Sequence, residues 1–354
     1  MTRAPETRSD TLGQPPVAIT TPALRGERPA AAPPGPTDLR NAPRKARRRH
    51  DRLAIVLFLL PAVVLFVLLV LAPIGIAAVT SLYFWDGLTA PRFIGIDNFV
   101  RLFTDPLEAP IFRGDLVRHF ILIVLTLILQ LPLALALALL LNQRLAGRAV
   151  FRVIFFLPYI LSEAITAVLF LLMFSPNLGI TNQLIETLGI DRSSVLWLAQ
   201  PFSEPSAVLY ALFFVMTWKY FGFYMILYLA ARQNIPHELT DAAQIDGASD
   251  WQVFRYVTLP LLAPTIRITG FLAVIGTIKL FDLIWIMTNG GPLHASETMA
   301  ITMFRHGFVR HEIGYAAAIS VVIFLISLTF ALTYQRFVMK RDLEGAITGM
   351  RDQR

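Results

Sequence analysis

The chain has 354 residues, of which 55% are hydrophobic and only 16% are charged, whereas about a quarter of an average soluble domain is charged. This composition excludes a disordered protein and an ordinary soluble one, and the absence of cysteine excludes disulfides, thiolate nucleophiles and zinc–thiolate sites. Because the apolar residues form uninterrupted runs of about 20, the length that a helix needs to cross a bilayer, the sequence predicts an all-α integral membrane protein.

Residues 1–50 differ in composition from the rest of the chain. They hold nine of the 23 prolines and end in a basic cluster at residues 44–49, which predicts a disordered, basic cytoplasmic tail. The first apolar run, Leu53–Tyr83, is too long for the core of a cleavable signal peptide and begins too far along the chain. It is therefore expected to remain as the first membrane helix.

Five more apolar runs are long enough to span a bilayer. Residues 131–138 alternate with period two, as a strand would, but an open strand would leave its backbone unpaired in lipid, so a helix is predicted. Six transmembrane helices put both termini on one side, with residues 51–341 as a six-span domain and 342–354 as a C-terminal tail. The five runs are Ile121–Leu141, Val153–Phe174, Ala207–Ala231, Ile268–Thr288 and Ile313–Tyr334.

Lysine and arginine near the ends of the spans predict the orientation. The side that carries both tails has 15 of these residues, and the other side has 7. Because cytoplasmic segments of membrane proteins are enriched in basic residues, both termini are predicted to be cytoplasmic. The same asymmetry explains the net charge of +7 without a role for nucleic acid.

The predicted cytoplasmic loop at residues 232–264 is much longer than a connection between spans needs to be. A short helix is expected from Pro236 to Ile245, and Gly247 can end it because glycine adopts a left-handed backbone without steric cost. Ser249 and Gln252 have the spacing of a capping box, so a second helix is expected from Ser249 and should end before Pro260.

The residues around this turn suit a docking element. Small side chains at residues 242, 243 and 248 allow another protein to approach closely, and carboxylates at residues 241, 246 and 250 can bind its basic groups. The alternative is a structured surface hairpin that only links two spans.

The motif Asp241-Ala242-Ala243, with Asp246-Gly247-Ala248 and the later Val257-Thr-Leu-Pro260, resembles the EAA loop of binding-protein-dependent ABC importer permeases. The flanking Ile235-Pro-His-Glu-Leu239 resembles the carbohydrate-uptake branch. Weaker likenesses at residues 98–103, 147–159, 289–292 and 314–317 extend the resemblance over residues 53–341. The family usually has glutamate where Asp241 stands. The resemblance implies a type I importer fold and assigns ATPase coupling to Glu238, Asp241, Ala242, Ala243, Asp246, Gly247 and Ala248.

The resemblance also implies partners. The chain has no phosphate-binding loop of the form G-x-x-x-x-G-K-[ST], so ATP would be bound and hydrolysed by other chains, and this one needs no cofactor and is no enzyme. The implied complex holds a second permease subunit, two ATP-binding cassette subunits and an extracytoplasmic solute-binding protein for a sugar or sugar-like solute. It would lie among the lipids of a bacterial-type inner membrane, with no nucleic acid partner.

Ionisable groups inside the predicted spans are candidates for the translocation pathway, because burying charge in a membrane is costly. Lys279 and Asp282 are three residues apart and are expected to share a helix face. The two side chains can either neutralise each other there or line the pathway, and the sequence favours neither alternative. A helix-ending turn is enough to explain Asn289-Gly-Gly-Pro292. The tentative pathway set is Glu163, Trp218, Lys219, Tyr220, Lys279, Asp282 and Asn289.

Two other functions remain open on the sequence alone. A secondary transporter of a polar solute would carry its own ion-coupling carboxylates but would have no use for the 236–260 hairpin. A membrane enzyme would need a cluster of nucleophilic or metal-binding residues, and the six histidines show no zinc-ligand spacing. An ATP-driven importer permease is therefore the favoured prediction.

Overall fold

The computed structural model describes residues 44–143, 145–176, 179–189, 197–198 and 207–340, and side chains only from residue 55. The predicted tails therefore lie largely outside the described residues. The chain divides into two units, residues 1–65 and 66–354, which are considered separately. The first helix, α1 (Arg44–Phe66), begins at the basic cluster, and the disorder of the tail before it stays a prediction. Lysine and arginine are good helix formers and extend this helix backward.

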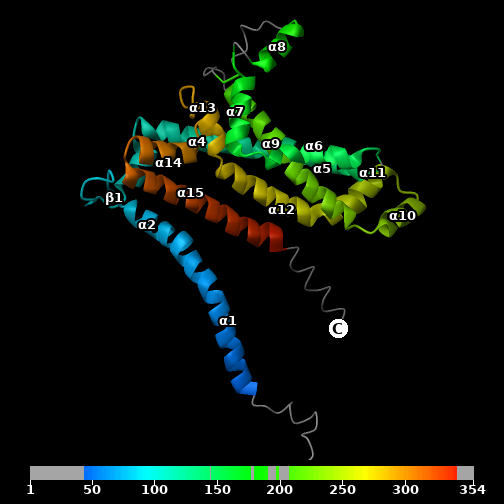
Figure 1. Cartoon of the computed structure of the whole chain (residues 1–354), viewed down its shortest axis with the longest axis horizontal. Helices are drawn as coiled ribbons and strands as arrows, with labels where there is room; N and C mark the ends of the chain where they lie inside the picture. The colour runs from blue at the N-terminus through cyan, green and yellow to red at the C-terminus, as the bar shows by residue number, and fades with distance from the viewer. Residues whose placement is uncertain (1–43, 144, 177–178, 190–196, 199–206, 341–354) are drawn as a thin grey trace, which may run out of the picture. The chain divides into compact units, whose positions relative to one another are not determined.

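The described part of the chain is almost entirely helical (Figure 1). Five helical stretches among the described residues are long and apolar enough to cross a membrane, and a pair of helices joined at a sharp bend gives six if the pair is one span. The five stretches are Ile55–Thr80, Glu108–Asn142, Ala207–Gln233, Asp250–Ile278 and Ile313–Met339, and the pair is Arg148–Ile160 with Glu163–Met173. The described residues thus hold five to six candidate spans, and two of the predicted spans are built differently from the expectation.

The elements follow one another with several single π-helical turns inside helices or at their ends. These turns are η2 (Val67–Leu71), η3 (Thr126–Gln130), η5 (Phe254–Thr258), η6 (Arg305–Val309) and η7 (Gln335–Met339). The remaining helices are α2 (Ala72–Thr80), α3 (Asp97–Thr104), α4 (Glu108–Leu125), α5 (Leu131–Asn142), α6 (Arg148–Ile160), α7 (Glu163–Met173), α8 (Ile180–Thr187), α9 (Ala207–Gln233), α10 (His237–Ile245), α11 (Asp250–Val253), α12 (Leu259–Ile278), α13 (Asp282–Thr288), α14 (Met299–Phe304) and α15 (Ile313–Tyr334).

The third span is broken rather than continuous. Helices α6 and α7 meet at an angle of 97°. Pro158 weakens the last turn of α6 because it has no N–H. Leu161 is then extended, and the hydroxyl of Ser162 accepts the N–H of Ile165 to start α7. An apolar run shows no such break, since hydropathy is the same on both sides of it.

The fifth span is displaced from its prediction. It runs from Asp250 to Ile278 instead of from Ile268 to Thr288, and α13 is a separate short helix. The second short helix of the loop does not end before Pro260, because α11 continues through η5 into α12. In the π-helical turn the Leu259 N–H binds the carbonyl of Phe254, five residues back. This wider turn accommodates the proline, whose ring would clash with a regular helical turn.

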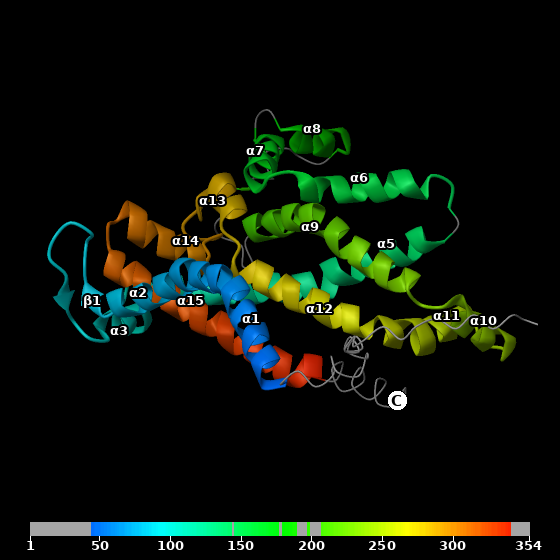
Figure 2. The same cartoon turned by 60° about the horizontal axis from the view of Figure 1, so that its bottom comes forward.

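Helix α9 lies at the centre of the second unit and packs against α5, α6 and α12 (Figure 2). Its apolar face belongs to two buried clusters, one with α7 and α13 and one with α5. A third cluster joins α3, α4, α12 and α15. Polar residues such as Asp115, Gln130 and Lys219 are buried inside, whereas many large apolar side chains are exposed, as expected of a surface that faces lipid.

One small hairpin marks the end of the bundle opposite α10 (Figure 1). Strands β1 (Tyr83–Phe84) and β2 (Arg92–Phe93) pair antiparallel, and the start of α15 packs directly on β1. The Gly314 N–H donates to the Trp85 carbonyl over 3.1 Å, and a Cβ on Gly314 would lie 1.9 Å from the Tyr83 carbonyl oxygen. Only glycine fits this contact, which accounts for one of the weaker sequence likenesses.

Candidate functional site

A cavity of about 250 Å³ lies between the third, fourth and fifth spans and the middle of the second. It brings together four of the predicted pathway residues, Glu163, Tyr220, Lys279 and Asp282. The break in the third span places Glu163 at the first position of α7, and the Tyr220 hydroxyl of α9 donates to its carboxylate. The rest of the wall is formed by Thr126, Gln130, Met216, Tyr224, Ala273, Gly276, Thr277 and Leu280.

Two wall residues that the sequence analysis did not single out are the most informative. Thr126 and Gln130 are 2% and 1% exposed. Among the described residues, the Thr126 hydroxyl and the Gln130 side-chain nitrogen have no hydrogen-bond partner. Both belong to the π-helical turn η3, a feature often found at functional sites. Both atoms are buried from solvent, so they make this part of the wall polar without facing the open space of the cavity.

Lys279 and Asp282 do not share a helix face. Lys279 ends α12, Phe281 has φ −134° and ψ −65°, and Asp282 begins α13. Neither a hydrogen bond nor an ion pair joins the two side chains in the part of the chain that is described. The expected pairing within one helix is therefore wrong, because the helix is interrupted between them. Both side chains line the cavity instead.

The other three predicted pathway residues lie elsewhere. Trp218 packs edge-on against Phe170, with ring centroids 5.1 Å apart. Lys219 is buried, and its ammonium donates to the Leu161 carbonyl over 2.5 Å. Asn289 ends α13 in a left-handed conformation, as expected of a helix-ending turn, and its carbonyl accepts the Arg305 guanidinium. These three are not in the cavity wall, and their pathway role stays a prediction.

The predicted docking element is a helix, a glycine turn and a second helix. Gly247 has φ +87°, and the turn that follows α10 has both hydrogen bonds of a Schellman motif. The Ala248 N–H donates to the Ala243 carbonyl and the Gly247 N–H to the Gln244 carbonyl, each over 3.0 Å. The capping box is also present, since Ser249 and Gln252 bond each other's backbone N–H. The sequence-based prediction of this turn is confirmed.

The surface of the docking element is open. A Cβ on Gly247 would meet no atom within 4 Å. Glu238, Ala242 and the carboxylates at residues 241, 246 and 250 are exposed, and Ala243 and Ala248 are partly exposed. Asp241 also borders a shallow pocket with Arg232, whose Nη1 is buried without a hydrogen-bond partner among the described residues. In the same described ranges, no cluster of histidine, aspartate or glutamate is placed to hold a metal ion.

Comparison with known proteins decides the family. Residues 130–341 match the binding-protein-dependent transport system inner membrane component family. The chain belongs to this family. A probable ABC transporter permease protein of Pyrococcus horikoshii is 34% identical over 289 residues, which are 81% of this chain and 96% of the relative. The lactose transport system permease protein of Rhizobium radiobacter is 34% identical over 81% of this chain and 93% of its own length.

A solved structure is also similar. A bacterial ABC transporter involved in the import of the acidic polysaccharide alginate matches with a TM-score of 0.67 and 26% identity, over 83% of this chain and 99% of that one. The chain is therefore a multi-pass inner-membrane permease subunit of a binding-protein-dependent ABC transporter, and ATP is hydrolysed by partner subunits. Family membership excludes the secondary transporter and the membrane enzyme.

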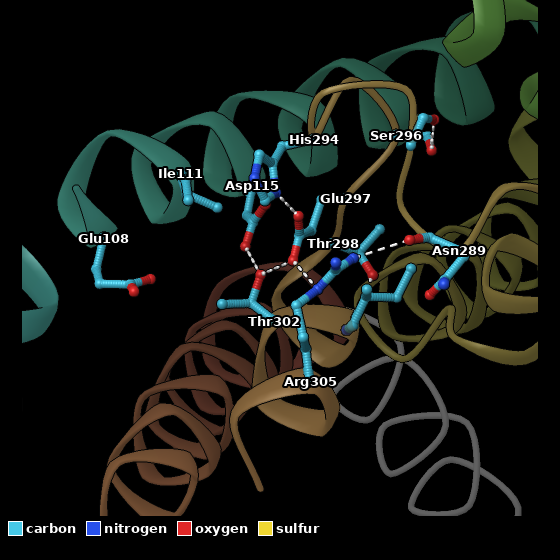
Figure 3. Close-up of polar contacts among 12 residues, drawn as sticks. Glu108, Ile111, Asp115, Asn289, His294, Ser296, Glu297, Thr298, Thr302 and Arg305 are labelled. Atoms are coloured by element: carbon cyan, nitrogen blue, oxygen red, sulfur yellow. Dashed lines mark hydrogen bonds and ion pairs between the residues drawn. The ribbon is translucent and has the colours of Figure 1, made fainter. Parts of the chain in front are cut away.

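The permease has a buried polar network that the sequence analysis missed (Figure 3). The Thr302 hydroxyl of α14 lies 2.5 Å from the Asp115 carboxylate of α4 and 3.1 Å from that of Glu297. Arg118 pairs with Asp115 and donates to the Glu297 carbonyl, and Arg305 lies 3.2 Å from the Glu297 carboxylate. The network fixes the segment after α13 to α4. Its only sequence signal was the i,i+3 pair Asp115 and Arg118, in a segment assigned to a loop.

A second network joins the ends of four elements of the permease near the hairpin. The two ring nitrogens of His306 lie 2.6 Å from Glu312 and 3.1 Å from Glu108. Arg101 pairs with Glu312 over 3.0 Å, and Arg310 pairs with Glu108 over 2.7 Å. The hydrogen bond from His306, together with that from Arg101, lowers the pKa of Glu312 to about 2. These contacts hold α3, α4, η6 and α15 together.

Proposed function

We propose that this permease forms one half of the membrane pathway of an ATP-driven importer for a sugar or sugar-like solute. The observation that carries the proposal is the continuity between the docking element and the cavity. Helix Asp250–Ile278 begins directly after the Gly247 turn and ends at Lys279 in the cavity wall. At 1.5 Å per residue its 29 residues reach about 43 Å, so movement of the turn would be carried to the cavity.

The cavity supports a hydroxyl-rich, sugar-like solute. Its wall places polar and charged residues, among them Glu163, Lys279 and Asp282, beside the rings of Tyr220 and Tyr224. Hydrogen-bonding groups next to apolar ring faces suit a sugar. Similar proteins support a sugar-like solute. One is the permease of a lactose transport system, and another is a transporter of solved structure that is involved in the import of alginate. The solute itself would be selected mainly by the separate binding protein.

The proposed assembly has four further subunits. A second permease would complete the pathway, two ATP-binding cassette subunits would bind the cytoplasmic face, and an extracytoplasmic binding protein would deliver the solute. Both termini would be cytoplasmic, with the six-span domain over residues 51–341 and the coupling loop over residues 232–264. The hairpin end of the bundle, opposite α10, would then face outward.

In this mechanism the α10–α11 turn sits in a cleft of one ATPase subunit. ATP-driven closure of the two ATPases moves the turn, and α12 carries the movement to the cavity, which is exposed alternately to the two sides of the membrane. The small residues Ala242, Ala243, Gly247 and Ala248 allow a close fit. Asp241 supplies a carboxylate for a basic group of the ATPase.

Charge reversal at Asp241 tests the coupling. Asp241→Lys should abolish solute uptake and co-purification of the ATPase subunits, because the exposed carboxylate becomes a cation. Asp241→Glu, the matched control, keeps the charge and should be nearly silent. The measurement is recovery of the ATPase subunits with the tagged permease, together with uptake of labelled solute. Normal uptake by Asp241→Lys would refute the assignment of this element.

A further inference from the structure

The break in the third span creates an energetic problem inside the membrane. Where α6 ends, its last carbonyl groups lose the N–H donors that a continuous helix would provide, and no water replaces them in the hydrocarbon layer. The backbone turns by 97° between Ile160 and Glu163. A bend of this size needs partners from a neighbouring element to hold it, because the two helices have no intrahelical hydrogen bonds across the extended residue Leu161.

Two consecutive residues of α9 contact the two sides of this break. On the α6 side, the Lys219 ammonium donates to the Leu161 carbonyl over 2.5 Å. On the α7 side, the Tyr220 hydroxyl donates to the Glu163 carboxylate. Lys219 is only 2% exposed, and it is absent from the cavity wall that contains Tyr220 and Glu163.

A close approach between α9 and α6 positions the backbone of α9 for these two contacts. A Cβ on Gly222 would lie 1.9 Å from the Phe155 carbonyl oxygen, so the two helices touch backbone to backbone at this point. Helices α6 and α9 also pack along each other. Lys219 and Tyr220 lie one turn or less before this contact, which leaves their side chains little freedom to move away from the break.

The charges match the ends of the two half-helices. The C-terminal end of a helix carries partial negative charge, and the N-terminal end carries partial positive charge. Lys219 places a cation at the end of α6, and Glu163 places an anion at the first position of α7. A solute contact would instead require the ammonium to face the cavity, whereas the ammonium donates its hydrogen bond to the Leu161 carbonyl at the break.

We propose that Lys219 is a positioning residue that, with Tyr220, clamps the broken third span and keeps Glu163 in the wall of the solute cavity. This inference rests on the proposed function in one respect, which is that the cavity is part of the solute pathway. It assigns Lys219 to the scaffold of the pathway rather than to the solute. Movement of α9 during transport would then carry both halves of the third span together.

The test is the reactivity of a buried reporter cysteine, which needs no solute. Thr277 is 2% exposed in the cavity wall, and its hydroxyl bonds only within its own helix, so Thr277→Cys is a mild change in a chain with no other cysteine. Membrane vesicles that hold the full permease with its partner subunits are treated with methanethiosulfonate ethylammonium, and the rate of labelling is measured. Leu88→Cys, 89% exposed at the hairpin, is the matched reporter outside the cavity.

Lys219→Met should raise the labelling rate of the cavity reporter at least tenfold and leave the Leu88→Cys rate unchanged. Lys219→Arg keeps a cationic donor and should stay within threefold of the native rate, and Tyr220→Phe should raise it at least threefold. A native rate in Lys219→Met, or an equal rise in Lys219→Arg, would overturn the clamp. If Lys219→Met does not accumulate, a native rate in Tyr220→Phe overturns it. None of these results touches the import assignment, which fails only if the native transporter takes up no solute.

Discussion

Gly247→Val distinguishes two effects at the docking turn, which are strain in its backbone and intrusion of a side chain on a partner subunit. Gly247 has φ +87°, so a β-branched residue there costs about 1 to 2 kcal/mol of backbone strain. That is a factor of about 5 to 30 in the population of the correct turn. Within the chain nothing else is lost, because a new Cβ meets no atom within 4 Å. A loss of uptake beyond about 30-fold must then come from the side chain intruding on a partner.

The assay is uptake of labelled solute and solute-stimulated ATP hydrolysis, with the amount of permease in the membrane as a control. Gly247→Val should abolish both activities while the protein still inserts and accumulates, since the turn lies outside the spans. Gly247→Asn is the matched variant, because asparagine tolerates the left-handed conformation but still adds a side chain. It should also abolish uptake. Normal transport by Gly247→Val would refute the reasoning and remove the main structural support for coupling at this turn.

Three further predictions concern the cavity, the second network and the orientation. The double change Thr126→Val and Gln130→Leu in the cavity wall should not lower the thermal unfolding temperature, because it removes buried polar atoms that have no partner in the described residues; a less stable protein would contradict this. Glu312 has its pKa lowered from 4.5 to about 2, so its contacts stabilise the folded state above pH 4.5 and the contribution is lost as pH falls toward 2. Glu312→Gln should therefore lower the unfolding temperature at pH 7, and the deficit should shrink between pH 4.5 and 2. On intact cells an impermeant thiol reagent should label Leu88→Cys at the hairpin and not Ser249→Cys; labelling of position 249 would reverse the proposed orientation.

The sequence by itself determined the features that depend on local pattern. Apolar runs of spanning length predicted six membrane segments, because the cost of an unpaired backbone in lipid leaves helices as the solution. The Gly247 turn was equally predictable, since a Schellman turn and a capping box are set by residues within a few positions of each other. The resemblance of the 241–260 motif to the EAA loop identified the family, which the comparisons confirm.

Only the tertiary structure decided where helices break and which polar groups meet. The third span bends at Leu161 and the fifth ends at Ile278, although the apolar runs continue past both points. Sequence spacing consequently suggested a Lys279–Asp282 pair that the interruption removes. The sequence alone suggested that Lys219 lines the pathway, because its contact with Leu161, 58 positions away, is formed only in the tertiary structure. Thr126 and Gln130 were not singled out, because only the packing of four separate spans leaves their polar atoms unpaired around one cavity.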